Sequence, residues 1–163
     1  MSDLQREELA IQKEIRFAED QLVLWIQKHM DDFEIHARQV RQKAERENDR
    51  NKKNYGKLEE SQFRNVIRVA ETTDSPEVIK NFLLYQLGRD NKWGAGKDSL
   101  AVKIIADIGS ADSDSRLYTL AHKVAHGAAS QNIHSIWLDL IRRYLGYGSR
   151  YLVYLNKKTK RNK

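Results

Sequence analysis

The sequence contains no cysteine, a single proline and only eight glycines among its 163 residues. Without cysteine, disulfide bonds, thiolate zinc sites and cysteine nucleophiles are excluded. So little glycine and proline argues against a turn-rich all-β fold and against a Pro-rich linker protein. No run of apolar residues approaches the 18 that a membrane-spanning helix needs, and the polar start MSDLQREEL does not resemble a secretory signal. We therefore expect a cytoplasmic protein without membrane contact.

What the sequence has in excess is positive charge, and that charge is unevenly distributed. The 29 Lys and Arg residues against 23 Asp and Glu give a formal net charge of +6. Residues 1–56 hold 11 basic and 12 acidic residues, whereas residues 57–163 hold 18 basic and 11 acidic ones. A basic body behind a near-neutral leader indicates a polyanionic partner for the body and a different role for the leader.

Residues 3–47 have the pattern of one long amphipathic helix. Ser2 and Gln5 form the spacing of a capping box, and apolar residues then recur largely at intervals of three, four and seven. Such a helix either lies across its own domain or pairs with a neighbouring chain, and the sequence leaves both alternatives open. Its apolar residues end before 45–56, which we expect to be a solvated link. The expected leader therefore covers residues 1–50.

The remaining sequence is helical as well. Helices are expected over about 58–72, from Ser75-Pro76 to Gly88, from an N-cap at Asp98 to Gly109, over about 114–127, and from 131 toward the C-terminus. Gly146 and Gly148 are positions where the last helix could kink. No strand pairs or repeats are recognisable. We predict an all-α helical bundle of five or six helices, with a body over 57–156 and a basic flexible tail over 157–163.

Patterns that would indicate cofactor or metal chemistry are weak. The loop WGAGKDS lacks the glycine and the Ser or Thr spacing of a Walker phosphate loop, and it follows a helix. Trp93 in this loop either caps the core or stacks on nucleic acid. His29, Asp32 and His36 share a helix face without a second-helix Glu-x-x-His, and HKVAH lacks the glutamate of a zinc protease. We therefore expect no metal and no cofactor.

One pattern is compatible with catalysis. Arg116 and His122 fit the R-x4–6-H spacing of HEPN-type ribonucleases, which are also all-α. That resemblance implies phosphate stabilisation by Arg116 and proton transfer by His122. On a straight helix the two side chains lie about 120° apart, which weakens the match.

The C-terminal segment combines basic and aromatic residues. Four tyrosines recur every three or four residues from Tyr144 to Tyr154, with Arg142, Arg143 and Arg150 between them. The tyrosines either face the core or present rings to bases, while the arginines present cations to phosphates. Lys92, in the loop before Trp93, is a further candidate for RNA binding.

The segment Phe82–Arg89, FLLYQLGR, resembles the "Leu-x-Tyr-Gln-x-Gly-Arg" signature of the small subunit of type III CRISPR–Cas effector complexes, the Csm-type small subunit. Gln62-Phe63-Arg64 and the Tyr-x-x-Tyr end at Tyr151–Tyr154 correspond to flanking features of that family. The resemblance covers about residues 57–155. The helix over 3–47 and the WGAGK loop are additions to the family pattern, and Asn81-Phe82 stands where the family usually has Pro-Lys.

The resemblance implies a non-catalytic RNA-binding subunit that stabilises a guide or target RNA through its backbone and stacks with other subunits. Transferred to this sequence, the implied RNA contacts are Arg64, Arg68 and Arg89, followed by Lys80 and Arg142. Arg64 and Arg68 have an ordinary alternative, ion pairs with Glu60 and with Glu71 or Asp74. The alternatives for the whole chain are a HEPN-like metal-independent ribonuclease and a self-associating helical adaptor.

Overall fold

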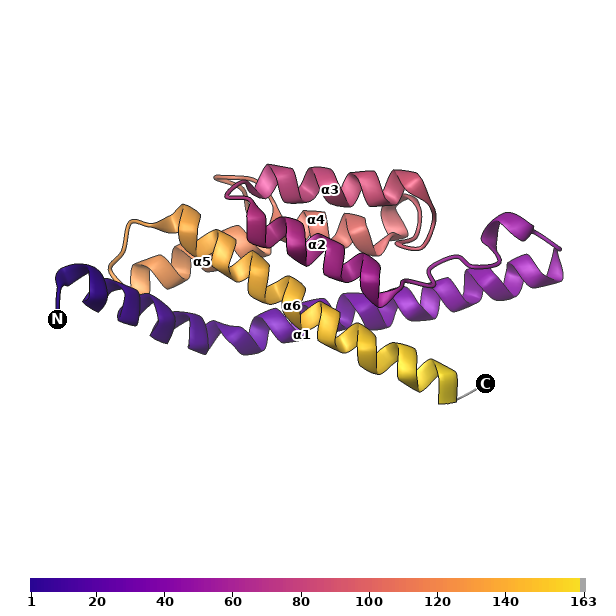
Figure 1. The fold of residues 1–163 in the computed structure, drawn as a ribbon, viewed down its shortest axis with the longest axis horizontal. Coiled ribbons are helices and arrows are strands. Elements are labelled where there is room, and N and C mark those ends of the chain that lie inside the picture. The colour runs from indigo at the N-terminus through magenta and orange to yellow at the C-terminus, as the bar shows by residue number, and fades with distance from the viewer. Residues whose placement is uncertain (162–163) are drawn as a thin grey trace.

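Helices account for most of the chain (Figure 1). The computed structural model describes the backbone of residues 1–161 and the side chains of residues 1–159. Two short 3-10 turns, Arg50–Lys52 and Gly96–Asp98, accompany the α-helices, and no strand occurs in the described part of the chain. The α-helices are α1 (Asp3–Arg46), α2 (Glu60–Thr72), α3 (Pro76–Arg89), α4 (Leu100–Ile108), α5 (Arg116–Gly127) and α6 (Ile133–Arg161). The prediction of an all-α bundle with a long first helix is confirmed.

The helix boundaries follow from local capping chemistry. Ser2 and Gln5 form the expected capping box at α1, and the Ser75 hydroxyl accepts from the Val78 N–H at the start of α3. Gly109 ends α4 with a φ of 72°, a value that favours glycine. The cap of α4 is Ser99 rather than the expected Asp98, since the Ser99 hydroxyl accepts from the Val102 N–H.

The inner face of α1 is part of the core of the bundle. Figure 1 shows α1 running along the length of the molecule, crossed by α6, with α2, α3 and α4 stacked on one side. α1 packs against α4, α5 and α6. Its buried residues are Ile11, Ile15, Ala18, Leu22, Ile26, Met30, Phe33, Ala37 and Ala44. Of the two alternatives for this helix, the structure shows the one in which it lies across its own domain.

The expectation of a solvated link over 45–56 is confirmed for residues 45–54, which are exposed apart from the half-buried Asp49, but the end of the segment is anchored. Tyr55 is buried, and its hydroxyl accepts a hydrogen bond of 3.0 Å from the Ala95 N–H. The Tyr55 carbonyl accepts from Arg41 Nη1 at 2.6 Å. A buried aromatic side chain and two hydrogen bonds therefore hold the end of this segment against α1 and the loop after α3.

The aromatic residues of the loop and of α6 fill the core. Trp93 is fully buried, with its ring centroid 5.3 Å from that of Phe63, so it caps the core and is not available for stacking on nucleic acid. Trp137 is also buried and donates from Nε1 to the Ile108 carbonyl at 2.9 Å. α6 continues through Gly146 and Gly148 to Arg161, so the expected tail at 157 is helical as far as that residue; residues 162–163 of it lie outside the described residues. Over the described residues, none of the helices combines the length and apolarity required to cross a membrane.

Candidate nucleic-acid interface

The outer face of α2 carries two of the predicted RNA-binding arginines. Gln62, Phe63, Val66 and Ala70 turn inward, which leaves Arg64 and Arg68, one helical turn apart, exposed to solvent. Arg68 Nη1 donates to Asn65 Oδ1 at 3.3 Å. Among the described residues, no carboxylate lies within ion-pair distance of either guanidinium. The alternative in which these arginines pair with acidic neighbours is therefore not found, and both keep donors for an external anion.

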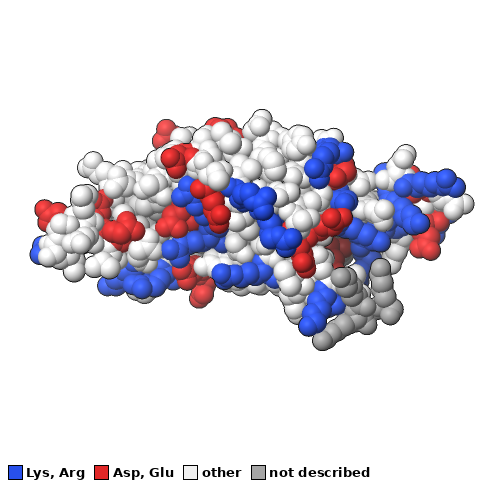
Figure 2. Space-filling model, in the orientation of Figure 1, with Lys and Arg blue, Asp and Glu red and all other residues white. Residues whose placement is uncertain are grey.

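The charged surface around these arginines is mixed. Figure 2 shows Lys and Arg side chains over α2 and α6 in the middle of the visible face, with acidic side chains between them, whereas the upper edge over α3 is largely uncharged. A polyanion on this face therefore meets separate cations rather than one continuous basic patch.

Arg142 stabilises the fold by bonding to the end of α2. Its Nε donates to the Ala70 carbonyl at 2.8 Å and its Nη2 to the Thr73 carbonyl at 2.9 Å. Asp74 lies 3.6 Å from the same Nη2. These carbonyls belong to the last turn and the C-cap of α2, where no intrahelical N–H is available for them. Arg142 thus caps α2 from α6 through Nε and Nη2.

Arg143 joins α6 to α1. Its Nε donates to Asp139 at 2.8 Å, its Nη1 to Glu19 at 2.7 Å and its Nη2 to Gln12 Oε1 at 2.8 Å. Burial lowers the pKa of Arg143, but the hydrogen bond and charge of Asp139, together with Glu19, outweigh burial and raise that pKa above its ordinary value. All three guanidinium nitrogens are therefore engaged within the chain.

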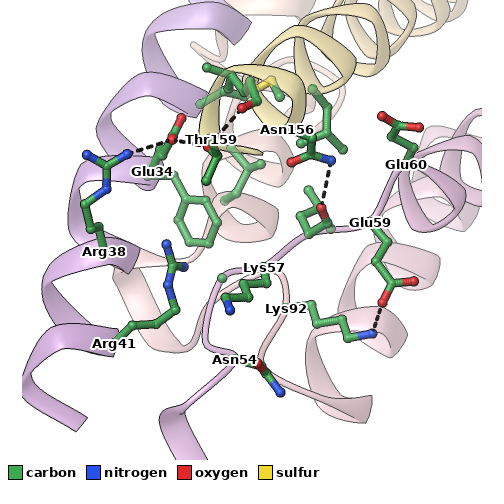
Figure 3. Close-up of a pocket in the computed structure, with 17 residues that line it drawn as sticks. Glu34, Arg38, Arg41, Asn54, Lys57, Glu59, Glu60, Lys92, Asn156 and Thr159 are labelled. Carbon is green, nitrogen blue, oxygen red and sulfur yellow. Dashed lines mark hydrogen bonds and ion pairs between the residues drawn. The ribbon is translucent and has the colours of Figure 1, made fainter. Parts of the chain in front are cut away.

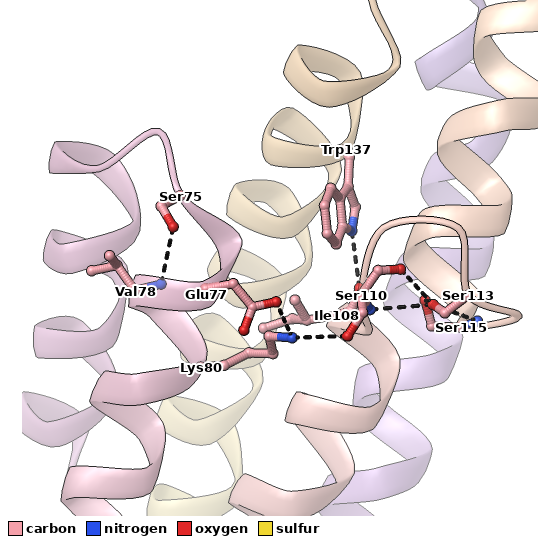
Figure 4. A network of polar contacts seen from close by, with 9 residues as sticks. All are labelled: Ser75, Glu77, Val78, Lys80, Ile108, Ser110, Ser113, Ser115 and Trp137. Atoms are coloured by element: carbon pink, nitrogen blue, oxygen red, sulfur yellow. Dashed lines mark hydrogen bonds and ion pairs between the residues drawn. The ribbon is translucent and has the colours of Figure 1, made fainter.

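Lys80 also has partners from two elements. Its Nζ lies 2.6 Å from Glu77 Oε1 and donates to Ser110 Oγ at 3.3 Å, and only 11% of its side chain is exposed. Figure 4 shows Lys80 pointing from α3 toward the loop after α4, where Ser110 and Ser113 bond to each other. The geometry makes Lys80 a link between α3 and this loop.

Arg89 and Lys92 lie near the end of α3. Arg89 Nε is 3.6 Å from Asp90, and its guanidinium lies 6.0 Å from the centroid of the exposed Tyr85 ring. Lys92 Nζ bonds to Glu59 Oε1 at 2.6 Å. Arg89 remains about half exposed beside an aromatic ring, whereas Lys92 is held by a close carboxylate.

Arg150 projects from α6 into solvent beside tyrosines. Its guanidinium lies 5.9 Å from the Tyr147 ring centroid, and the rings of Tyr151 and Tyr154 are 5.8 Å apart. The Tyr151 hydroxyl donates to Asp31 at 2.6 Å, and burial with this bond raises the pKa of Tyr151 to about 12. Tyr154 is 56% exposed. The tyrosines of α6 are thus divided, with Tyr144 in the core and Tyr154 presented to solvent.

The structure also contains a polar cluster that the sequence did not predict as a unit. Asp107 of α4 is 6% exposed and accepts from the Tyr144 hydroxyl at 2.6 Å, and His29 Nε2 of α1 lies 2.9 Å from the same carboxylate oxygen. Burial and then the charge of Asp107 raise the pKa of Tyr144 well above its ordinary value. The only sequence signal of this cluster is the single acidic residue of the helix Leu100–Ile108, which is apolar apart from that residue and Lys103.

Arg116 and His122, the pair considered for ribonuclease chemistry, lie on different sides of α5. Arg116 Nη1 lies 3.8 Å from Asp107 Oδ1, and its guanidinium stacks over Trp25 at 5.4 Å from the ring centroid. His122 is exposed and packs edge-on against Tyr118. Arg116 therefore contacts the polar cluster around Asp107, on a different side of α5 from His122.

The histidines do not converge into a metal site in the described part of the chain. His29 belongs to the Asp107 cluster, whereas His36 packs edge-on against Tyr55 and Asp32 pairs with Lys28. No group of three or more His, Asp or Glu side chains over the described residues is arranged to hold a metal ion.

The chain was compared with protein families, curated proteins and solved structures. No family model, curated protein or solved structure matches it.

Proposed function

We propose that this chain is an RNA-binding protein without a catalytic role, which holds the RNA backbone through exposed arginines. The observation that carries the proposal is the pair Arg64 and Arg68 on the outer face of α2, which lack a carboxylate partner among the described residues. Arginine donors at such positions suit phosphate oxygens, and contacts to phosphate do not depend on base sequence. The net charge of +7 on residues 57–163 adds long-range attraction for a polyanion.

Two Arg–Tyr pairs, each with an exposed arginine, support the same proposal. Arg89 lies beside Tyr85 on α3, and Arg150 lies beside Tyr147 on α6, near the exposed ring of Tyr154. An arginine next to an aromatic ring offers a cation for phosphate and a flat surface for a base. Because Arg142, Arg143, Lys80 and Lys92 are held by partners within the chain, we assign the RNA contacts primarily to Arg64, Arg68, Arg89 and Arg150.

The FLLYQLGR segment leads us to propose a setting for this RNA binding. Because this segment resembles the signature of the Csm-type small subunit, we propose that the protein acts within a type III CRISPR effector complex. Its partners there would be other subunits and a guide or target RNA. Gln86 of this segment is buried and Tyr85 is exposed, so the segment fixes the end of α3 and presents Tyr85 and Arg89 outward. The outward orientation of Tyr85 and Arg89 supports a role of this segment in binding RNA.

Fluorescence anisotropy with labelled single-stranded RNA and with an RNA duplex tests the proposal. We expect sequence-independent binding, and the double variant Arg64→Ala/Arg68→Ala should lower the salt slope of log K by about 1 per lost phosphate contact. A matched control, Lys13→Ala/Arg16→Ala, removes the same charge from exposed positions on α1. Absence of binding at low salt would overturn the proposal, and equal weakening by both double variants would contradict the site on α2.

The ribonuclease alternative has a direct test in the same preparation. It requires metal-independent cleavage of RNA that His122→Ala abolishes. RNA that stays intact in the presence of the wild-type protein and a chelator contradicts this alternative.

Self-association is the second candidate function, and the outer face of α1 favours it. Phe17, Leu24 and Ile35 are 72%, 64% and 60% exposed. Leu24 and Ile35 lie about two and five helical turns after Phe17, so the three side chains form one row on the side of α1 opposite the core. An adaptor that pairs through α1 would cover this row.

A further inference from the structure

A groove lies between the C-terminal halves of α1 and α6, apart from the arginines of α2. Residues 54–60 close one side of it, and its volume is about 930 Å³, which is enough for a small molecule (Figure 3). Its apolar lining comes from α1, from the segment before α2, from α4 and from α6. These residues are Met30, Phe33, Leu58, Leu100, Leu152 and Leu155.

Two arginines of α1 line the groove on one side. Arg38 Nη2 pairs with Glu34 at 3.2 Å, whereas Arg41 Nη1 donates to the Tyr55 carbonyl at 2.6 Å. Within the described residues, no carboxylate lies within ion-pair distance of Arg41. Burial and then the neighbouring charge of Arg38 lower the pKa of Arg41. An anion between the two guanidiniums would relieve this repulsion and accept the remaining donors of Arg41.

The rest of the rim is polar and of mixed charge. The carboxylates Glu59 and Glu60 lie on the side away from the arginines, where Lys92 pairs with Glu59. Two amide side chains on the rim can bond to a heterocycle. Figure 3 shows Asn54 and Asn156 on different sides of the groove, with Lys57 near the centre of the view. Asn156 Nδ2 donates weakly to the Leu58 carbonyl at 3.4 Å, which leaves its carbonyl oxygen for a ligand. A simple alkyl acid would leave these amides unused, and phosphate alone would leave the apolar lining exposed. A flat ring with hydrogen-bonding edges and an attached phosphate satisfies both.

We propose that this groove binds a nucleoside monophosphate, with the phosphate at Arg38 and Arg41 and the base against the apolar lining. The ligand is either a free nucleotide or the phosphorylated end of an RNA strand. The site goes beyond the proposed function, since it shares no residue with the arginines of α2, α3 and α6.

Isothermal titration calorimetry of the full chain with AMP, adenosine and inorganic phosphate tests this site. We expect AMP to bind about tenfold or more tightly than either fragment, because only AMP uses both the arginines and the apolar lining. Arg38→Ala and Arg41→Ala should each weaken AMP binding about tenfold, as expected for a charge-assisted contact. Arg38 is an exposed position, so its variant stays informative if loss of the Tyr55 bond disturbs the fold of Arg41→Ala.

Matched variants separate this site from the α2 interface. Lys43→Ala removes an exposed charge on the same helix outside the groove, and it should leave AMP binding unchanged. Arg64→Ala/Arg68→Ala should also bind AMP as the wild type does, even if RNA binding is lost. No heat of binding with millimolar AMP, or binding unaffected by both Arg38→Ala and Arg41→Ala, would overturn the proposal. Competition by RNA carrying a 5′-phosphate but not by the 5′-hydroxyl form would identify an RNA end as the source of the nucleotide.

Discussion

At the scale of single residues, Asp107 is the side chain on which the buried polar cluster depends. Replacing Asp107 by Ala leaves the buried Tyr144 hydroxyl and His29 without their shared acceptor. We expect Asp107→Ala to lower the free energy of unfolding by about 1–3 kcal/mol, the usual penalty for an unsatisfied buried polar group. Urea denaturation followed by circular dichroism measures this change. Asp114→Ala, at an exposed position two residues before α5, is the control, and equal stability of the two variants would contradict the structural role of Asp107.

The arginines show how far sequence predicts the role of a single residue. The alternation of Arg and Tyr in 142–154 is the same for a cation that faces solvent and for one that faces another helix. Arg150 is exposed, but Arg142 caps the end of α2 and Arg143 bonds to α1. These partners are 69 to 131 residues away along the chain, so no local pattern reports them. Exposure of Arg64 and Arg68 was predictable, because the apolar spacing of their own helix determines it.

At the scale of helices, α6 contains a matched pair of glycines with opposite surroundings. A Cβ on Gly148 would lie 2.6 Å from Phe63 Cζ and 2.9 Å from Ile26 Cγ1, whereas a Cβ on Gly146 would have no atom within 4 Å. Gly146→Ala should therefore raise stability by about 0.5–1 kcal/mol through helix propensity. Gly148→Ala should lower stability by about 1–3 kcal/mol, because α6 must shift from α1 and α2. Thermal denaturation of both variants checks this difference in sign, and stabilisation by both would contradict the close packing at Gly148.

Helices were more predictable than the segments between them. Caps and apolar periodicity are local, so all six helices were expected close to where they lie, and Gly109 ends α4 as expected. Residues 45–56 lacked apolar periodicity and were expected to be solvated, yet Tyr55 is buried through contacts with residues 40 positions away. The groove beside Tyr55 could not be predicted from the sequence either, because its lining combines residues of α1, α4, α6 and this segment.

At the scale of the whole molecule, α1 has two faces with separate consequences. Its inner face supplies nine buried residues to the core, so removing residues 1–50 would expose the apolar surfaces of α4, α5 and α6. Removal of residues 1–50 therefore cannot distinguish loss of folding from loss of self-association. Only substitutions on the outer face, where Phe17, Leu24 and Ile35 are exposed, can separate these two effects.

We expect the double variant Phe17→Ser/Leu24→Ser to be folded and to have a lower average mass than the wild type in light scattering after size exclusion, because two apolar side chains leave the pairing surface. Val78→Ser/Leu84→Ser is the control, since it removes two exposed apolar side chains from α3, with exposures of 45% and 53%. A wild-type chain that stays monomeric at the highest accessible concentration would contradict self-association through α1. If the wild type associates and only the α1 variant does not, the long helix both completes the core and joins copies of the protein. The exposed arginines of α2 would then be repeated along such an assembly, as binding to an extended RNA backbone requires.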